Sequence, residues 1–313
     1  MMYSLWSLLF FIVFSNQEPR DEPGIEVSSF EDEGSMGRCW RLRDEKCPNP
    51  DINFWLFTKA NPYGMKLSLD NLPIDKFLPL KPLKVLIHGF DGHRHYTPNF
   101  QLRPRFLELD INVISLDFPK LVKSPCYSEA VHNAKYVGRC TAHFLTTLLE
   151  RKLVAIEGLH LIGFGLGAHV AGFVGNLMTK YHLEHITGLD PAKPYYLVND
   201  TAEKLDRMDT HYCYHNRSAE YYAESITTPI GFIGYFCPNF KSFATGVCVP
   251  KEDTETMGFH AHPQARGRYF LDTNKSPPYA MGKNYMHLNR QLKGKTFLND
   301  DIIERILENN SIG

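Results

Sequence analysis

A glycine-rich turn separates a strand pattern from a helix pattern at residues 159–175. The segment reads LHLIGFGLGAHVAGFVG and has glycine at positions 163, 165 and 167. Two chemistries use this local design, and they require different residues at position 165. Dinucleotide-binding folds require glycine there, whereas hydrolases with a nucleophile elbow require serine, because the turn lifts that side chain toward the substrate. The residue at position 165 therefore decides which chemistry is available.

The dinucleotide interpretation rests on Gly163, Gly165 and Ala168, which match the fingerprint G-x-G-x-x-A between a strand and a helix. That fingerprint also requires an acidic residue at the end of the next strand, about twenty positions further on. Glu184 lies before the next strand pattern, and Asp190 lies later than usual. We therefore disfavour dinucleotide binding, and we expect neither a cofactor nor a metal ion.

Short apolar runs alternate with helical patterns along the chain, and these elements must position the turn. The strand patterns lie at 52–58, 84–90, 112–118, 159–164 and 185–190, and a long helical pattern lies at 130–152. This alternation predicts an α/β fold, with a mostly parallel central sheet and helices on both faces in a single domain. Sites in such sheets form at the carboxyl ends of the strands. Three strand ends are chemically suggestive, at 88–90, 163–167 and 188–190.

The first residues and the charge balance indicate a secreted, extracellular protein. Leu5 to Phe14 is apolar but too short to span a bilayer, and polar residues follow at once, so we interpret residues 1–16 as a signal peptide. Residues 17–38 are acidic and poor in large apolar residues, which predicts a flexible leader. No later segment is long and apolar enough to cross a membrane. The formal net charge of −1 gives no attraction to nucleic acid.

Cysteines and glycan acceptor triplets point to the same compartment. The chain has seven cysteines, which fit an oxidising environment and leave one cysteine without an intramolecular partner. Asn-x-Ser/Thr triplets are common by chance and support secretion only weakly. They begin at Asn199, Asn216, Asn274 and Asn309.

Five motifs occur in the order found in animal neutral lipases. They read HGF at 88–90, GFGLGAHVAGFVG at 163–175, GLDPAKP at 188–194, CYHNRSAEYYAESI at 213–226 and MGFHAHPQARGRYFLDTNKSPPY at 257–279. From Cys39 to Tyr279 the sequence resembles the pancreatic-lipase-like family, in particular its insect secreted and phospholipase A1-type members, which lack the extra C-terminal β-sandwich. The resemblance implies an α/β-hydrolase fold over residues 39–300, followed by a C-terminal tail at 301–313.

The resemblance also implies a catalytic triad. It assigns Asp190 as the acid and His215 as the base, and it assigns the backbone N–H groups of Phe90 and Leu166 to the oxyanion hole. The chain order of nucleophile, Asp and His is that of an α/β-hydrolase. The nucleophile position falls on Gly165. Asp190 and His215 are then a remnant pair without a hydroxyl to activate.

The absence of a hydroxyl at Gly165 predicts the loss of hydrolysis. No Ser, Thr or Cys occurs between residues 159 and 175 to replace it. Removal of the nucleophile from subtilisin costs about a millionfold in rate, or about 8 kcal/mol of transition-state stabilisation. Glycine relaxes the strained backbone of an elbow, so we expect the fold to survive. We interpret two further histidines of the motifs, His88 and His169, as structural residues.

The interval between Asp190 and His215 is a second departure, because it spans only 25 positions. In the family this interval is longer and holds a further strand and a surface loop that helps to cover the site. We therefore expect the sheet to close differently near His215, or to stay loose there. The usual partner of Cys213 lies in the absent stretch, so Cys213 is predicted to be the unpaired cysteine. It is off the elbow, which disfavours it as a thiol nucleophile.

The other six cysteines can pair in several ways, because spacing does not determine connectivity. We expect Cys237 to pair with Cys248 and to close a short aromatic loop. The pairs Cys39 with Cys126 and Cys47 with Cys140 are one choice among those that remain. The aromatic segment at 231–243 could touch a lipid surface, but burial beneath its own disulfide is the simpler interpretation.

Together these features predict a secreted lipase-like protein that has lost its nucleophile and binds a lipid, a lipid-like ester or another protein. Contact with a membrane surface fits this interpretation, and no particular protein partner is indicated. One alternative is an active triacylglycerol lipase or phospholipase A1 that acts in lipid catabolism. Another is a storage protein of the fly yolk type, for which the small size and the acidic leader give no positive support.

Overall fold

The computed structural model describes residues 11–12, 39–42, 46–73, 77, 81–191, 208–244 and 254–282. The chain divides into two units, and each is described by itself. The sheet unit comprises residues 12–99 and 110–199, and the α4 unit comprises residues 1–11, 100–109 and 200–313.

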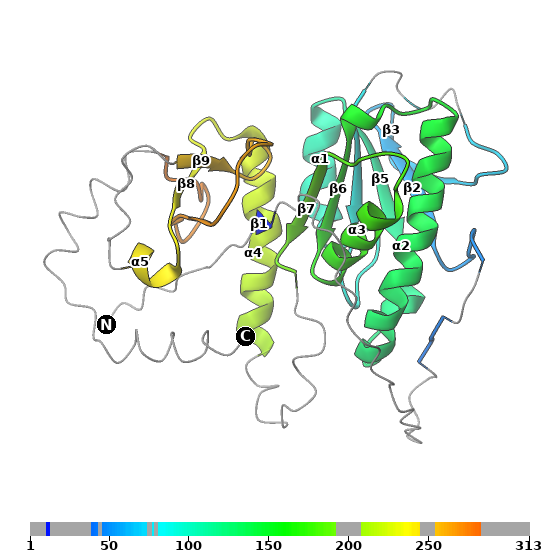
Figure 1. Ribbon diagram of the computed structural model, residues 1–313, viewed down its shortest axis with the longest axis horizontal. Helices are drawn as coiled ribbons and strands as arrows, with labels where there is room; N and C mark the ends of the chain where they lie inside the picture. Colours follow the sequence, from blue (N-terminus) through cyan, green and yellow to red (C-terminus); the bar gives the residue numbers. More distant parts are fainter. Residues whose placement is uncertain are drawn as a thin grey trace, which may run out of the picture. The chain divides into compact units, whose positions relative to one another are not determined.

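A seven-stranded sheet forms the centre of the sheet unit (Figure 1). Its order in space is β1-β7-β6-β4-β5-β2-β3. The strands are β1 (Phe11–Ile12), β2 (Asn53–Thr58), β3 (Asn61–Leu67), β4 (Leu83–Ile87), β5 (Asn112–Asp117), β6 (Leu159–Phe164) and β7 (His185–Leu189). Strands β4 to β7 pair in parallel, whereas β2 pairs antiparallel with both β3 and β5. The five apolar runs of the sequence are therefore strands β2, β4, β5, β6 and β7.

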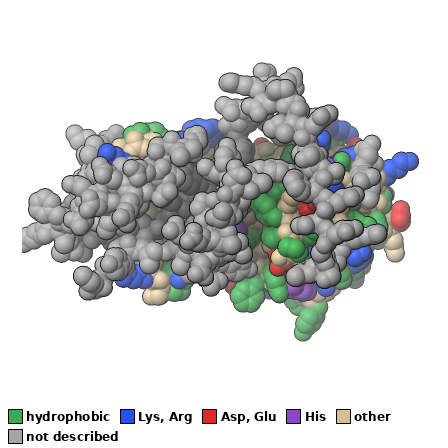
Figure 2. All heavy atoms as spheres, turned by 90° about the horizontal axis from the view of Figure 1, so that it is seen from below, with side chains coloured by type: hydrophobic (Ala, Val, Ile, Leu, Met, Phe, Trp, Pro, Cys, Tyr) green, Lys and Arg blue, Asp and Glu red, His purple; other side chains and the backbone are tan. Residues whose placement is uncertain are grey.

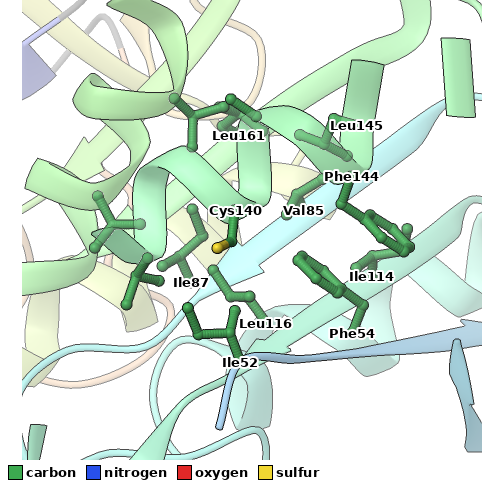
Figure 3. Close-up of a cluster of buried hydrophobic side chains, with 14 of the residues drawn as sticks. Ile52, Phe54, Val85, Ile87, Ile114, Leu116, Cys140, Phe144, Leu145 and Leu161 are labelled. Carbon is green, nitrogen blue, oxygen red and sulfur yellow. The ribbon is translucent and has the colours of Figure 1, made fainter. Parts of the chain in front are cut away.

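Two helices pack over one face of this sheet, namely α2 (Tyr127–Glu150) and α3 (Leu166–Leu177). The buried positions of α2 recur every three or four residues, as expected for a helix with one apolar stripe. They include Ala130, Ala134, Val137, Thr141, Leu145 and Leu148. In Figure 3 the ring of Phe144 on α2 lies against Phe54 on β2, with ring centroids 3.8 Å apart. Short 3-10 turns, η2 (Pro119–Val122) and η3 (Ile156–Gly158), connect these layers.

The α4 unit contains α1 (Asn99–Glu108), of which residues 100–108 belong to this unit, and α4 (Met208–Thr227). It also contains α5 (Phe240–Ala244) and an antiparallel sheet of order β10-β8-β9. These strands are β8 (Phe232–Phe236), β9 (Thr254–Met257) and β10 (Tyr269–Phe270). Phe106 of α1 packs near Phe259, with ring centroids 5.7 Å apart. The resemblance did not predict this small sheet.

The aromatic segment at 231–243 lies mostly in the interior of the α4 unit. Phe232, Tyr235, Cys237 and Phe243 are buried, whereas Phe236 is 45% exposed. Among the described helices, none combines the length and the apolar character that a membrane span requires. On the face drawn in Figure 2, hydrophobic side chains lie among charged side chains of both signs.

Candidate active site

The turn between β6 and α3 consists of Gly165 alone, since β6 ends at Phe164 and α3 begins at Leu166. Gly165 has φ +53° and ψ −118°, a conformation that residues with a side chain adopt only under strain. Its N–H donates to the carbonyl of Leu189 at 3.0 Å, and its carbonyl accepts from the N–H of Ala168 at 3.1 Å. A sharp, strained turn from strand to helix is the backbone geometry of a nucleophile elbow.

The flanking glycines of this turn, Gly163 and Gly167, are required by close packing. A Cβ at Gly163 would collide with the carbonyl of Gly167, and a Cβ at Gly167 would collide with the carbonyls of Ile87 and His88. All of these obstacles are backbone atoms, which cannot move aside as a flexible side chain can. The elbow therefore keeps its shape through the contact of β6, α3 and β4, without any contribution from a nucleophile.

The loop after β4 lies directly against the elbow. At Gly89, a Cβ would lie 2.9 Å from the carbonyl oxygen of Phe164 and 3.7 Å from the backbone nitrogen of Leu166. Phe90 is the next residue, and Leu166 is buried at the start of α3. The structure thus brings together the two segments that carry the predicted oxyanion donors.

His88 is a buried residue at the end of β4 with both ring nitrogens engaged. Its Nε2 accepts a hydrogen bond from the N–H of Phe118 at 3.2 Å, so its Nδ1 carries the proton and donates to the carbonyl of Gly89 at 2.9 Å. Burial lowers the pKa of His88 to about 4. A neutral imidazole with both nitrogens occupied has a structural role, as the sequence interpretation holds. His169, the other histidine so interpreted, is half-buried on α3.

Asp190 follows β7 immediately and is exposed, with φ +42°. His215 lies in the other unit and is half-buried, and its carbonyl accepts a hydrogen bond from the hydroxyl of Ser218 at 2.8 Å. The pairing of Asp190 with His215 stays a prediction.

His215 stands on a regular helix. Helix α4 runs without a break from Met208 to Thr227 and contains His215. The cause is local, because residues 208–227 contain neither glycine nor proline and therefore nothing that would end a helix.

The structure joins Cys39 to Cys126 and Cys47 to Cys140. Cys237 is disulfide-bonded as well. Its predicted partner Cys248 and the side chain of Cys213 lie outside the described residues, so their predictions stand as made. The two pairs that the structure shows attach the segment before β2 to helix α2.

Two of the four predicted glycan acceptors lie in the described part of the chain. Asn216 is half-buried on α4, and the side-chain amide of Asn274 donates to the carbonyl of Pro278 at 2.7 Å. Asn199 and Asn309 lie outside the described residues. Glycosylation stays a prediction at all four positions.

The sequence reasoning missed Asp117, a buried carboxylate at the end of β5. It accepts two hydrogen bonds from Arg94, from the backbone N–H at 3.0 Å and from the guanidinium at 2.7 Å. The guanidinium also lies over the ring of Trp55, 4.1 Å from its centroid. The signal was an acidic residue at the end of an apolar run, the same signal that drew attention to Asp190. Within the described ranges, no group of three or more His, Cys, Asp or Glu side chains is placed to hold a metal ion.

A mostly parallel sheet with an elbow at the carboxyl end of β6 defines an α/β-hydrolase fold, as the sequence predicts. The family model described as Lipase matches residues 28–212 and 210–279, so the chain belongs to the Lipase family. The two matches meet at 210–212, inside the interval that we predict to be shortened.

Wasp and vertebrate proteins are among the relatives. The chain is 34% identical to "Probable phospholipase A1 magnifin" of Vespa magnifica over 58% of its own length and 57% of the relative. It is 33% identical to "Phospholipase A1" of Vespa velutina over 51% and 59%. It is 25% identical to "Pancreatic lipase-related protein 2" of Homo sapiens over 80% and 70%. The chain thus spans less than two thirds of the length of either wasp relative.

Proposed function

We propose that this protein is a secreted member of the Lipase family that does not hydrolyse esters and whose site binds a lipid or a lipid-like ester. The observation that carries the proposal is Gly165, which stands in the elbow conformation where hydrolysis requires a hydroxyl. The proposal keeps the fold and the ligand class of the family and removes one chemical step.

The missing step is the attack on the ester carbonyl. In an elbow hydrolase, a histidine takes the proton of the serine hydroxyl, the oxygen attacks the carbonyl, and two N–H groups stabilise the oxyanion that develops. Here the N–H groups of Phe90 and Leu166 can still donate hydrogen bonds to an acyl oxygen. No atom at position 165 can form the covalent bond, so a bound ester stays intact.

Two findings support the ligand class and the compartment. The relatives named above are called phospholipases A1 and pancreatic lipase-related proteins, and family membership makes lipid esters the favoured ligands. The two disulfides of the sheet unit are of the kind that persists in oxidising compartments.

The test compares the natural protein with its Gly165→Ser and Gly165→Ala variants. Fatty-acid release is measured on a short-chain ester and on phospholipid vesicles, and vesicle binding is measured by co-sedimentation. The alanine variant is the matched control, because it introduces the same backbone strain as serine without the hydroxyl. We expect release only from Gly165→Ser and vesicle binding by all three proteins.

Family membership alone also fits an active lipase or phospholipase A1. Turnover by the natural protein, above a mock preparation from the same host, would favour that alternative and overturn the proposal. Binding without turnover by Gly165→Ser would mean that Asp190 and His215 no longer form a working pair. The protein would then be a binding protein only.

A further inference from the structure

The turn that follows β4 contains an aspartate in a conformation that residues with a side chain rarely adopt. Asp91 directly follows Phe90, whose N–H is a predicted oxyanion donor, and it has φ +53°. Non-glycine residues keep such a backbone only where the surrounding structure holds it, and such residues cluster at functional sites. The contacts of Asp91 show what holds it.

Two hydrogen bonds attach Asp91 to the chain after β5. Its N–H donates to the carbonyl of Val122 at 2.7 Å, and its carboxylate accepts from the N–H of Ser124 at 3.2 Å. Val122 is fully buried at the end of η2, so this anchor is a rigid part of the sheet unit. Three residues further along the loop, the buried carboxylate of Asp117 holds Arg94.

The left-handed backbone at Asp91 closes a tight turn over residues 89–92. The N–H of Gly92 returns to the carbonyl of Gly89 at 3.3 Å, and a positive φ at the third residue is what a turn of type II requires. His88 donates a second hydrogen bond to the same carbonyl, at 2.9 Å. The carbonyl of Gly89 is therefore held from two sides.

The carbonyl of Gly89 and the N–H of Phe90 belong to one planar peptide unit, in which they point in opposite directions. Whatever holds that carbonyl therefore also aims the N–H of Phe90. We infer that Asp91 is a positioning residue, which fixes the direction of the Phe90 N–H by closing this turn. The inference rests on the proposed function, because it concerns how the same site holds the acyl oxygen of its ligand.

Three substitutions separate the contributions of Asp91. Asp91→Asn keeps a side-chain acceptor for Ser124 and tolerates the left-handed backbone, Asp91→Gly keeps only the backbone freedom, and Asp91→Ala keeps neither. Asp110→Ala is the matched control. Asp110 also has positive φ, +60°, and makes one exposed ion pair with Lys81 at 3.1 Å.

The first measurement uses the natural protein and does not depend on catalysis. Protein labelled with ¹⁵N-phenylalanine is titrated with decanoate, and the Phe90 resonance, assigned with a Phe90→Leu variant, is followed. We expect the resonance to shift in the natural protein, in Asp91→Asn and in Asp110→Ala. We expect Asp91→Ala to bind decanoate about tenfold more weakly than the natural protein does, and Asp91→Gly to have an affinity between those two. No shift in the natural protein, or equal losses for Asp91→Ala and Asp110→Ala, would overturn the inference.

The second measurement places the same substitutions in the Gly165→Ser background. We expect Asp91→Ala to lower kcat on a short-chain ester about tenfold with KM unchanged, and Asp91→Asn to retain kcat. An unchanged kcat in Asp91→Ala overturns the inference and leaves the proposed function intact. If Gly165→Ser is inactive while decanoate still reports the loss in Asp91→Ala, the inference stands and the fault lies with Asp190 and His215.

Discussion

The elbow and the helix that carries His215 match the expected site in opposite ways. At the elbow, the backbone has the shape of a hydrolase turn, and the side chain is missing at Gly165. In α4 the side chain of His215 is present and stands on a helix, whereas we expected the chain near it to close differently or to stay loose. The elbow thus has the expected backbone without a hydroxyl, and α4 has the expected histidine on a helix that the sequence did not predict.

Packing explains this difference. The turn at Gly165 is bounded by Gly163 and Gly167, whose α-carbons lie against backbone carbonyls of the neighbouring segments. Because the obstacles are backbone atoms, this fit constrains the turn whatever residue occupies position 165. For α4 the described residues point to local sequence as the cause, because residues 208–227 contain neither glycine nor proline.

The largest effect is expected from breaking the fit of the elbow. In Gly167→Ala, the new methyl group meets the carbonyls of Ile87 and His88, which cannot rotate away. We expect the free energy of unfolding to fall by about 3 kcal/mol, at the upper end for overpacking. Urea unfolding followed by circular dichroism measures the change.

Gly172→Ala is the matched control on the same helix, because no atom lies within 4 Å of its added Cβ. Replacing a helical glycine by alanine should raise stability by about 0.5 to 1 kcal/mol. If the two variants unfold at similar urea concentrations, packing does not preserve the elbow, and the comparison with α4 loses its explanation.

The second largest effect is expected from acid, which should lower the stability of the sheet unit that contains the elbow. Burial lowers the pKa of His88 to about 4, below the 6.5 of an unfolded histidine. The unfolded chain therefore binds more protons than the folded one between these values, so stability is complete above pH 6.5 and falls as the pH is lowered toward 4. The expected loss is about 2 to 3 kcal/mol from this residue.

The check is the slope of unfolding free energy against pH. His88→Asn should have a shallower slope between pH 6.5 and 4, whatever its stability at neutral pH. The slope should not vanish, because burial also lowers the pKa of His160 well below its usual value. His143→Asn, at an exposed position on α2, serves as the control and should keep the natural slope. Equal slopes in all three proteins would rule out His88 as a source of the acid sensitivity.

A smaller effect is expected in the α4 unit. The carboxylate of Glu224 accepts hydrogen bonds from the N–H groups of Tyr279 and Ala280, both at 2.8 Å, and so attaches the last described segment to α4. Glu224→Ala should cost about 1 to 2 kcal/mol. It should also speed cleavage by trypsin after Lys275. The cleavage rate of Glu224→Gln should lie between those of the natural protein and Glu224→Ala. Faster cleavage within the sheet unit as well would show that the two regions do not respond separately.

The sequence predicted the elements that are apolar throughout and missed those that are not. Strands β4 to β7 were located to within three residues at each end, because buried strands read as continuous apolar runs. Strand β3, which reads NPYGMKL, contains proline and glycine and has the composition of a loop. Strands β9 and β10 are short and partly polar, and only their pairing with β8 makes them strands.

The candidate site was likewise predictable only where its residues follow from a local requirement of the chain. The glycine spacing identified the elbow, since that spacing reflects a steric requirement within a few residues. Asp117 stands at the end of an apolar run, which marks the residue itself. The partners of Asp91 and Asp117 lie 33 and 23 positions away, however, and no pattern in the sequence identifies those partners. The helix through His215 was missed because the resemblance, rather than the local residues, determined the expectation.

The glycine at the elbow also has a consequence for inheritance. Codons for glycine and serine can differ by a single base, so the hydroxyl can be lost or regained in the smallest step that a gene can take. The neighbours of Gly165 cannot change so freely, because any side chain at Gly163 or Gly167 would collide with the main chain. Selection for folding alone therefore preserves the backbone conformation of this turn, whether or not the protein hydrolyses a substrate.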